Sequence, residues 1–265
     1  MIEKNIYDKI ETVIKMNKSI KATIALFAAA ILITGGYVGN MFGIFSEGNY
    51  KKVETNIDSA KNSPINGKTV IFLGSSVTFG YGSLGESFVE FLQDEDGIIP
   101  VKEAVSGTTL ADINKNSYVN RLKSLDLSLK ADAFICQLST NDATKNIPLG
   151  TIANDFDIED FDTQTIAGAI EYIIGYVRNH YNCPIVFYTQ AKYDSENYEK
   201  MVELLLEIQK KWNITIIDLW NDENINSITD NQKKLFLVDN IHPTKAGYRE
   251  WWLPEFRKCL YEILT

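Results

Sequence analysis

From Thr69 onward, the chain alternates short apolar runs with longer stretches in which apolar residues recur at helical spacing. This alternation is typical of α/β proteins, in which helices cover both faces of a parallel sheet. The expected strands are Thr69–Leu73, Val101–Val105, Ala133–Leu138, Ile185–Tyr188 and Ile214–Leu219. The expected helices are Ser87–Gln93, Leu110–Leu125, Thr163–His180, Ser195–Trp212 and Thr244–Leu264, and Pro254 should start a new turn or a kink in the last of them. We therefore expect an α/β fold with three layers and a central parallel sheet of about five strands.

An apolar segment without charged residues, 22–45, precedes this alternation. Its length suits a helix that crosses a bilayer, and the lysines that end at Lys21 place the N-terminus in the cytoplasm by the positive-inside rule. The small-residue pattern Ala28–Ala30 falls inside the apolar stretch and not beyond its end, which favours an uncleaved signal-anchor over a cleaved signal peptide. We expect a single-pass protein of the cell membrane with its folded domain outside the cytoplasm. The alternative is secretion after cleavage.

The predicted organisation has four parts: a basic cytoplasmic N-terminus at 1–21, a transmembrane helix at 22–45, a linker at 46–67, and one folded domain at 68–265. The formal net charge is −9, from 26 Lys and Arg against 35 Asp and Glu. Binding to nucleic acid requires a face rich in Lys and Arg that contacts phosphates. A nucleic-acid partner is therefore not expected.

The first expected strand, Thr69–Leu73, ends abruptly in a segment of small residues that contains Ser76. Gly74 and Gly80 on either side allow the backbone to turn sharply. In α/β proteins the ends of the strands are where ligands bind, so Ser76 is a candidate functional residue. Considered alone, the segment also fits a serine-rich turn without function.

The chain has only two histidines, and histidine is the usual general base at neutral pH. His180 falls at the end of a predicted helix, where a cation is favoured, so we expect a structural role for it. His242 lies in a loop with Asp239 three residues upstream. Asp239 can accept a hydrogen bond from Nδ1 of His242 and leave Nε2 to take a proton from a serine. Alone, this spacing fits loop capping equally well.

Two further polar positions follow predicted strands. Gly107 comes after the second strand and Asn141 after the third. Because parallel strands end along one edge of a sheet, we expect both residues to approach Ser76. The backbone N–H groups of Ser76 and Gly107, and the side-chain amide of Asn141, would then donate to a carbonyl oxygen that becomes negative, as an oxyanion hole requires. Considered separately, the glycine fits a turn and the asparagine a helix cap.

Together these segments resemble the SGNH (GDSL) hydrolase family, whose motifs supply serine, glycine, asparagine and histidine in this order. The match consists of Gly74-Ser75-Ser76-x-Thr78-x-Gly80, Gly107, Thr140-Asn141-Asp142 and Asp239-x-x-His242. There are two departures: Ser75 stands where the family has aspartate, and Ser139 where it has glycine. The resemblance implies a flavodoxin-like α/β/α fold over 68–265, no cofactor and no metal. It also implies a Ser76–His242–Asp239 triad and an oxyanion hole of Ser76, Gly107 and Asn141.

The resemblance implies a serine esterase that cleaves carboxylic esters, with short acyl groups such as acetyl on carbohydrate or cell-envelope material as the expected substrates. One alternative is an O-acyltransferase that uses the same nucleophile and passes the acyl group to a glycan. The other is a surface-binding module without catalysis. Fluorophosphonate labelling at Ser76 separates an enzyme from such a module, and product analysis with a glycan acceptor separates the two enzymes.

Two other motifs are weaker. The glycines of Gly80–Gly85 have dinucleotide-binding spacing but begin seven positions beyond the strand, where no helix clearly follows. The acidic segment 155–162 lacks the glycine and the terminal glutamate of a calcium loop. Neither motif predicts a cofactor or metal site.

Overall fold

The computed structural model describes residue 39 and residues 42–51 and 57–265. The predicted cytoplasmic N-terminus and most of the predicted transmembrane segment, 22–45, lie outside these residues. Within the described ranges, every helix is too short or too polar to span a bilayer.

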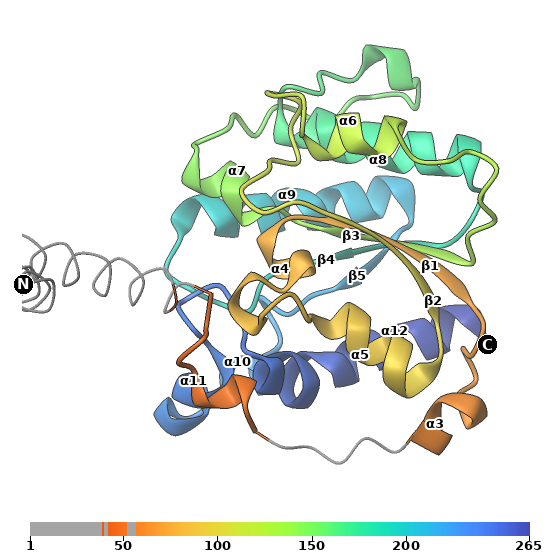
Figure 1. Ribbon diagram of the computed structural model, residues 1–265. Helices are drawn as coiled ribbons and strands as arrows, with labels where there is room; N and C mark the ends of the chain where they lie inside the picture. Colours follow the sequence, from red (N-terminus) through yellow and green to blue (C-terminus); the bar gives the residue numbers. More distant parts are fainter. Residues whose placement is uncertain (1–38, 40–41, 52–56) are drawn as a thin grey trace, which may run out of the picture. The chain divides into compact units, whose positions relative to one another are not determined.

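Among the described residues, five parallel strands form a single sheet in the order β2-β1-β3-β4-β5 (Figure 1). The strands are β1 (Thr69–Gly74), β2 (Ile99–Ala104), β3 (Ala133–Gln137), β4 (Ile185–Tyr188) and β5 (Thr215–Ile217). Ile71 of β1 pairs with Val101 of β2 on one side and with Phe134 of β3 on the other. The expected five-stranded parallel sheet is thus confirmed, with strand ends that differ from the prediction by no more than two residues.

Helices cover both faces of the sheet. Figure 1 shows α6 (Tyr118–Lys123), α8 (Ile166–His180) and α9 (Glu196–Trp212) on one side, and α5 (Phe88–Asp96) and α12 (Leu253–Leu264) on the other. Neighbouring strand residues face opposite layers, as the pleat of a strand requires. Ile71 and Leu73 belong to the core beneath α8 and α9, whereas Val70 and Phe72 belong to the core beneath α5 and α12.

The predicted helix Leu110–Leu125 is wrong over its first half, because only Tyr118–Lys123 is helical. The cause lies elsewhere in the chain. The carboxylate of Asp142 accepts hydrogen bonds from the backbone N–H groups of Leu110 (2.8 Å) and Ala111 (2.9 Å). These contacts hold the segment as a loop, and α6 begins only after Ser117, whose hydroxyl caps it.

The predicted helix Thr244–Leu264 is divided into a π-helical turn, η4 (Gly247–Trp252), and α12. Pro254 lies in the first turn of α12, where a missing N–H costs no hydrogen bond, as its position predicted. A side chain at Gly247 would place a Cβ atom 2.1 Å from the carbonyl oxygen of Phe236. The absence of a side chain at Gly247 therefore lets η4 pack against the backbone of the preceding helix.

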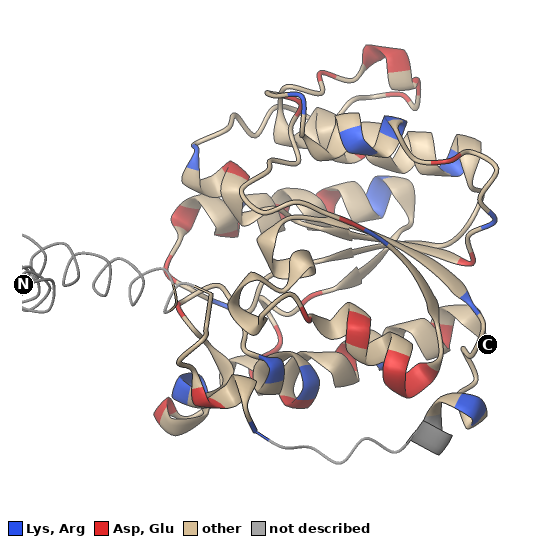
Figure 2. Cartoon of the chain, in the orientation of Figure 1, with Lys and Arg blue, Asp and Glu red and all other residues tan. Residues whose placement is uncertain are grey.

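The remaining elements are short. Those not yet given are η1 (Glu47–Asn49), α3 (Ile57–Asn62), α4 (Ser76–Phe79), η2 (Tyr81–Ser83), α7 (Thr140–Thr144), η3 (Ile158–Asp160), α10 (Glu223–Asn226) and α11 (Asp230–Phe236). None was predicted as a separate element. Two of them follow strands directly, α4 after β1 and α7 after β3, and these two carry site residues. Figure 2 shows Lys, Arg, Asp and Glu distributed over both layers of helices, with only acidic residues on α5.

Candidate active site

Ser76 is the first residue of α4, immediately beyond the end of β1. The turn between strand and helix is tight, because a Cβ atom on Gly74 would lie 1.8 Å from Oγ1 of Thr78. Only glycine therefore lets α4 fold back against the strand. Ser76 is largely buried, and its Oγ lies 2.8 Å from Nε2 of His242.

His242 is in turn held by Asp239. Nδ1 of the imidazole lies 2.8 Å from Oδ2 of Asp239, and the other carboxylate oxygen accepts the backbone N–H groups of Ile241 (2.8 Å) and His242 (2.7 Å). The carboxylate thus favours the tautomer with a proton on Nδ1. Nε2 is then free to accept the proton of Ser76 Oγ, which is the arrangement that activates a serine hydroxyl for attack on a carbonyl carbon.

The environment of Asp239 keeps its carboxylate ionised. Partial burial is the largest single effect and acts to raise the pKa of Asp239. The hydrogen bond from His242, attraction to its imidazole and the two backbone N–H groups act in the opposite direction and together outweigh burial. The pKa of Asp239 therefore lies below its ordinary value, so the acceptor for Nδ1–H is present at neutral pH.

The loop that carries His242 is fixed by backbone hydrogen bonds. The N–H of Val238 donates to the carbonyl oxygen of His242 (2.9 Å), and Leu237 and Pro243 form an antiparallel bridge. The ring of Tyr81 lies on the imidazole, with 5.1 Å between ring centroids. Main-chain pairing and an aromatic contact thus both limit movement of the imidazole.

The three candidate oxyanion donors follow three neighbouring strands of the sheet, β1, β2 and β3. Within the described part of the chain, the backbone N–H groups of Ser76 and Gly107 donate no hydrogen bond. The side-chain amide of Asn141 donates to the carbonyl oxygen of Thr108 (3.0 Å), which ties α7 to the loop after β2. An amide nitrogen carries two hydrogens, so one remains for a ligand.

The two departures from the family pattern have structural partners of their own. Ser75 is fully buried, and both its N–H (2.8 Å) and its hydroxyl (3.3 Å) donate to Oε1 of Gln137. Ser75 therefore points into the protein while Ser76 reaches His242. Ser139 caps α7, because its hydroxyl accepts the N–H of Asn141 (3.2 Å).

Two supporting residues were missed by the sequence analysis. Gln137 also accepts the hydroxyl of Thr78 (2.9 Å), so one amide oxygen anchors both ends of the serine turn. The sequence did offer a signal for Gln137, because it is a polar residue at the end of the otherwise apolar strand β3. Arg121 is buried and donates to the carbonyl oxygen of Gly74 (2.7 Å) and to the hydroxyl of Thr108 (3.1 Å). It connects the loops after β1 and β2, and nothing in its helical pattern distinguished it.

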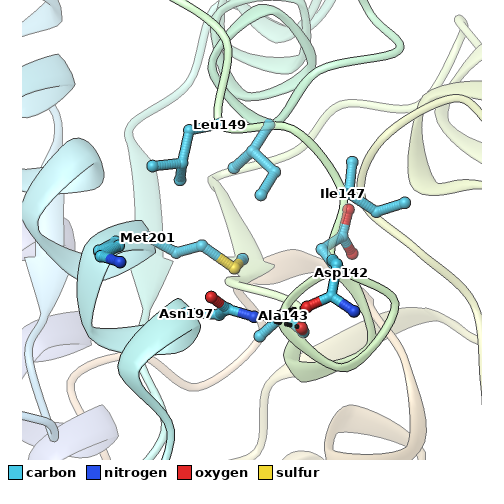
Figure 3. A pocket seen from close by; sticks show the side chains of 9 residues that line it. Asp142, Ala143, Ile147, Leu149, Asn197 and Met201 are labelled. Atoms are coloured by element: carbon cyan, nitrogen blue, oxygen red, sulfur yellow. Dashed lines mark hydrogen bonds between the residues drawn. The ribbon is translucent and has the colours of Figure 1, made fainter.

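A small pocket of about 100 Å³ lies between α7 and α9 (Figure 3). Asn197 donates to the side-chain oxygen of Asn146 (2.7 Å) at its wall. The triad residues do not line this pocket. Its lining residues are Asp142, Ala143, Asn146, Ile147, Leu149, Ile166, Asn197, Lys200 and Met201.

The glycine-rich segment Gly80–Gly85 forms a closed turn around η2. The N–H of Gly85 donates to the carbonyl oxygen of Gly80 (2.9 Å), and the hydroxyl of Ser83 donates to the same oxygen (3.0 Å). In a dinucleotide site the glycines lead directly from a strand into a helix. The segment is therefore not built as a phosphate-binding loop.

Residues 72–250 match the model of the GDSL-like lipase/acylhydrolase family. The chain belongs to this family. A GDSL-like acylhydrolase cleaves esters, so this protein is a carboxylic ester hydrolase. No curated protein sequence matches the chain.

Solved structures share the GDSL-like fold. A Lactobacillus plantarum protein is 17% identical and has a TM-score of 0.62, with 74% of this chain and 98% of that chain covered. An acetyl xylan esterase is 17% identical with a TM-score of 0.53, covering 72% and 99%. A family two carbohydrate esterase from Clostridium thermocellum, solved in complex with cellohexaose, is 14% identical with a TM-score of 0.50, covering 74% and 64%.

Proposed function

We propose that this GDSL-like hydrolase is a serine esterase that removes short acyl groups, such as acetyl, from carbohydrate or cell-envelope material. One observation carries the proposal, the hydrogen-bonded series from Ser76 Oγ through the imidazole of His242 to Asp239, with 2.8 Å at each of its two links. The fold shared with an acetyl xylan esterase and with a carbohydrate esterase supports an acylated glycan as substrate.

In the proposed reaction, Ser76 Oγ attacks the ester carbonyl carbon while its proton passes to Nε2 of His242. Asp239 stabilises the imidazolium that forms. When the tetrahedral intermediate collapses, Nε2 returns the proton to the leaving alcohol oxygen, and the acyl group remains on Ser76. A water molecule then repeats the sequence and releases the acid.

The negative charge of each tetrahedral intermediate requires donors fixed in advance. We assign this role to the backbone N–H groups of Ser76 and Gly107 and to the amide of Asn141. Two observations support the assignment. The backbone N–H groups of Ser76 and Gly107 have no hydrogen-bond acceptor among the described residues, and the hydrogen bond from Asn141 to Thr108 fixes the position of the amide. Loss of one such donor costs about 10²- to 10³-fold in kcat.

We further propose that the enzyme is anchored in the cell membrane by the apolar segment that begins at residue 22 and ends before Phe42, with the esterase domain outside the cytoplasm. Residues 42–45, predicted as the end of the membrane segment, instead form a turn that packs against the esterase domain. The support comes from the sequence, namely an uncharged segment of bilayer-spanning length preceded by lysines. Such a location would bring the enzyme close to cell-envelope glycans.

The test uses the full chain with p-nitrophenyl acetate and with acetylated xylan. Ser76→Ala should lower kcat by at least about 10³-fold, because the nucleophile and the base act as a unit. Ser75→Ala is the matched control, and it should still be labelled by a fluorophosphonate probe. Equal rates for wild type and Ser76→Ala would refute the assignment. With a glycan acceptor present, free acetate is the expected product, whereas transfer to the glycan would identify an acyltransferase.

A further inference from the structure

Residues 42–50 lie before the family match, which starts at residue 72, yet they pack against the loop of His242. Asn49 is 7% exposed and uses every hydrogen of its side-chain amide. Its Nδ2 donates to the carbonyl oxygens of Gly43 (2.7 Å) and Gly82 (2.9 Å), and its Oδ1 accepts the backbone N–H of Lys245 (2.8 Å). One side chain thus joins three separate parts of the chain.

Two glycines let this segment approach closely. A Cβ atom on Gly43, whose φ is +72°, would lie 2.2 Å from the carbonyl oxygen of Gly82. A Cβ atom on Gly48 would lie 2.0 Å from the carbonyl oxygen of Leu235 and 2.3 Å from Oγ1 of Thr244. The segment therefore contacts η2 on one side and the region around the histidine loop on the other.

The η2 turn in turn supports the imidazole. A Cβ atom on Gly82 would lie 2.9 Å from Cβ of His242, so the backbone of η2 is in direct contact with the histidine. The ring of Tyr81 packs between His242 (5.1 Å between centroids) and Phe42 (4.7 Å). Contacts are therefore continuous from residues 42–50, through η2, to the imidazole.

We propose that Asn49 is a positioning residue of the active site, which ties the backbone of Gly82, in contact with His242, to the backbone of Lys245, three residues after His242, and so keeps Nε2 within reach of Ser76. The proposal rests on the proposed function of these two residues. It also places residues 42–50 within the working enzyme, although they precede the family match. A chain cut at Lys68 would lack this support.

Substitutions at Asn49 affect all three hydrogen-bond partners at once. Alanine leaves the carbonyl of Gly82 and the N–H of Lys245 without their partner. Aspartate keeps an acceptor for Lys245 but places a carboxylate oxygen against two carbonyl oxygens, since it has no hydrogen to donate. A displacement of the base by about 1 Å is enough to lower kcat by about 10²-fold.

The experiment compares the full chain with Asn49→Ala and Asn49→Asp. Both variants should lower kcat and the rate of fluorophosphonate labelling by about 10- to 100-fold, with KM changed by less than about 3-fold, because the substrate contacts remain. Lys51→Ala is the matched control, since it removes the exposed ion pair with Glu250 (2.8 Å) but leaves Asn49 intact. It should behave as wild type.

The two histidines give a spectroscopic readout that a general loss of stability would not imitate. His180, whose Nδ1 bonds to the carbonyl of Tyr176 (2.8 Å), serves as an internal reference. In both Asn49 variants the imidazole NMR signals of His242 should shift while those of His180 stay. Should Asn49→Ala fail to fold, Asn49→Asp carries the test, because it keeps an acceptor for the N–H of Lys245 and removes only the two donors.

Wild-type kcat together with unshifted His242 signals in the Asn49 variants would overturn the inference, and so would an equal loss of kcat in Lys51→Ala. Failure of the proposed function would look different. In that case the wild-type chain itself would neither hydrolyse esters nor react with the fluorophosphonate at Ser76.

Discussion

Ser75 and Ser76 carry the same hydroxyl one residue apart, but different atoms surround them. The hydroxyl of Ser75 donates a hydrogen bond to Gln137, which lies 62 residues further along the chain, whereas the hydroxyl of Ser76 is hydrogen-bonded to His242. The family register predicted Ser76 as the nucleophile. The partner of Ser75 was not predictable from the motif, because it depends on which strand lies beside β1.

Asp239 provides a prediction at the same scale. Asp239→Asn should lower kcat by about 10²- to 10⁴-fold, because an amide N–H directed at Nδ1 of His242 requires an unprotonated Nδ1 and so favours the tautomer with its proton on Nε2. Asp222→Asn is the control, since Asp222 likewise accepts two backbone N–H groups but at the start of α10. A kcat for Asp239→Asn equal to that of the control would contradict this role.

The pH dependence of stability follows from the lowered pKa of Asp239. A carboxyl group whose pKa is lowered by folding stabilises the protein above the ordinary value of 3.8, and this stabilisation is lost as the pH falls through the lowered pKa. The difference in unfolding free energy between wild type and Asp239→Asn should therefore be constant near neutral pH and shrink below about pH 4. Urea denaturation at several pH values measures it.

Strands, short helices and loops differed in how far the sequence predicted them. Short apolar runs predicted the strands. The signal is strongest for β1, β3 and β4, which are almost completely buried, and weakest for the edge strand β2, which is half-buried and contains Lys102 and Glu103. Loop 110–117 was predicted as a helix because the pattern there is amphipathic, while the group that opposes the helix, Asp142, lies about 30 residues away. The hydrogen bonds of Asp142 also fix the loop that carries Gly107. The position of this oxyanion-hole candidate was therefore not predictable from the local sequence.

A substitution in α7 tests this contact. Burial raises the pKa of Asp142, although hydrogen bonds from Ala111 and Leu110 oppose this. Asp142→Asn offers a single acceptor oxygen to the two N–H groups, so one is left unpaired at a cost of about 1–3 kcal/mol in unfolding free energy. We also expect a lower kcat, because the loop of Gly107 loosens. Asp126→Asn, at an exposed turn, is the control, and an equal effect there would refute the interpretation.

For the whole molecule, the organisation of the chain predicts where the enzyme works. If the apolar segment that begins at residue 22 anchors it, the full chain should remain in the membrane fraction of the expressing cells after a carbonate wash. The double variant Leu26→Lys and Ile31→Lys should be released, because each central lysine costs about 2.5–3.5 kcal/mol in the bilayer. The same pair of lysines at Phe156 and Leu127, both exposed, should leave the protein in the membrane. Release of the wild-type chain by the wash would contradict the anchor.

The hydrogen bond between Asn49 and Lys245 joins positions 196 residues apart, and the bond between Ser76 and His242 spans 166. Contacts between such distant positions form late, since the entropy of closing a long loop must first be overcome. A chain that stops before His242 thus has a serine but no base to activate it, and such a product is not expected to hydrolyse esters.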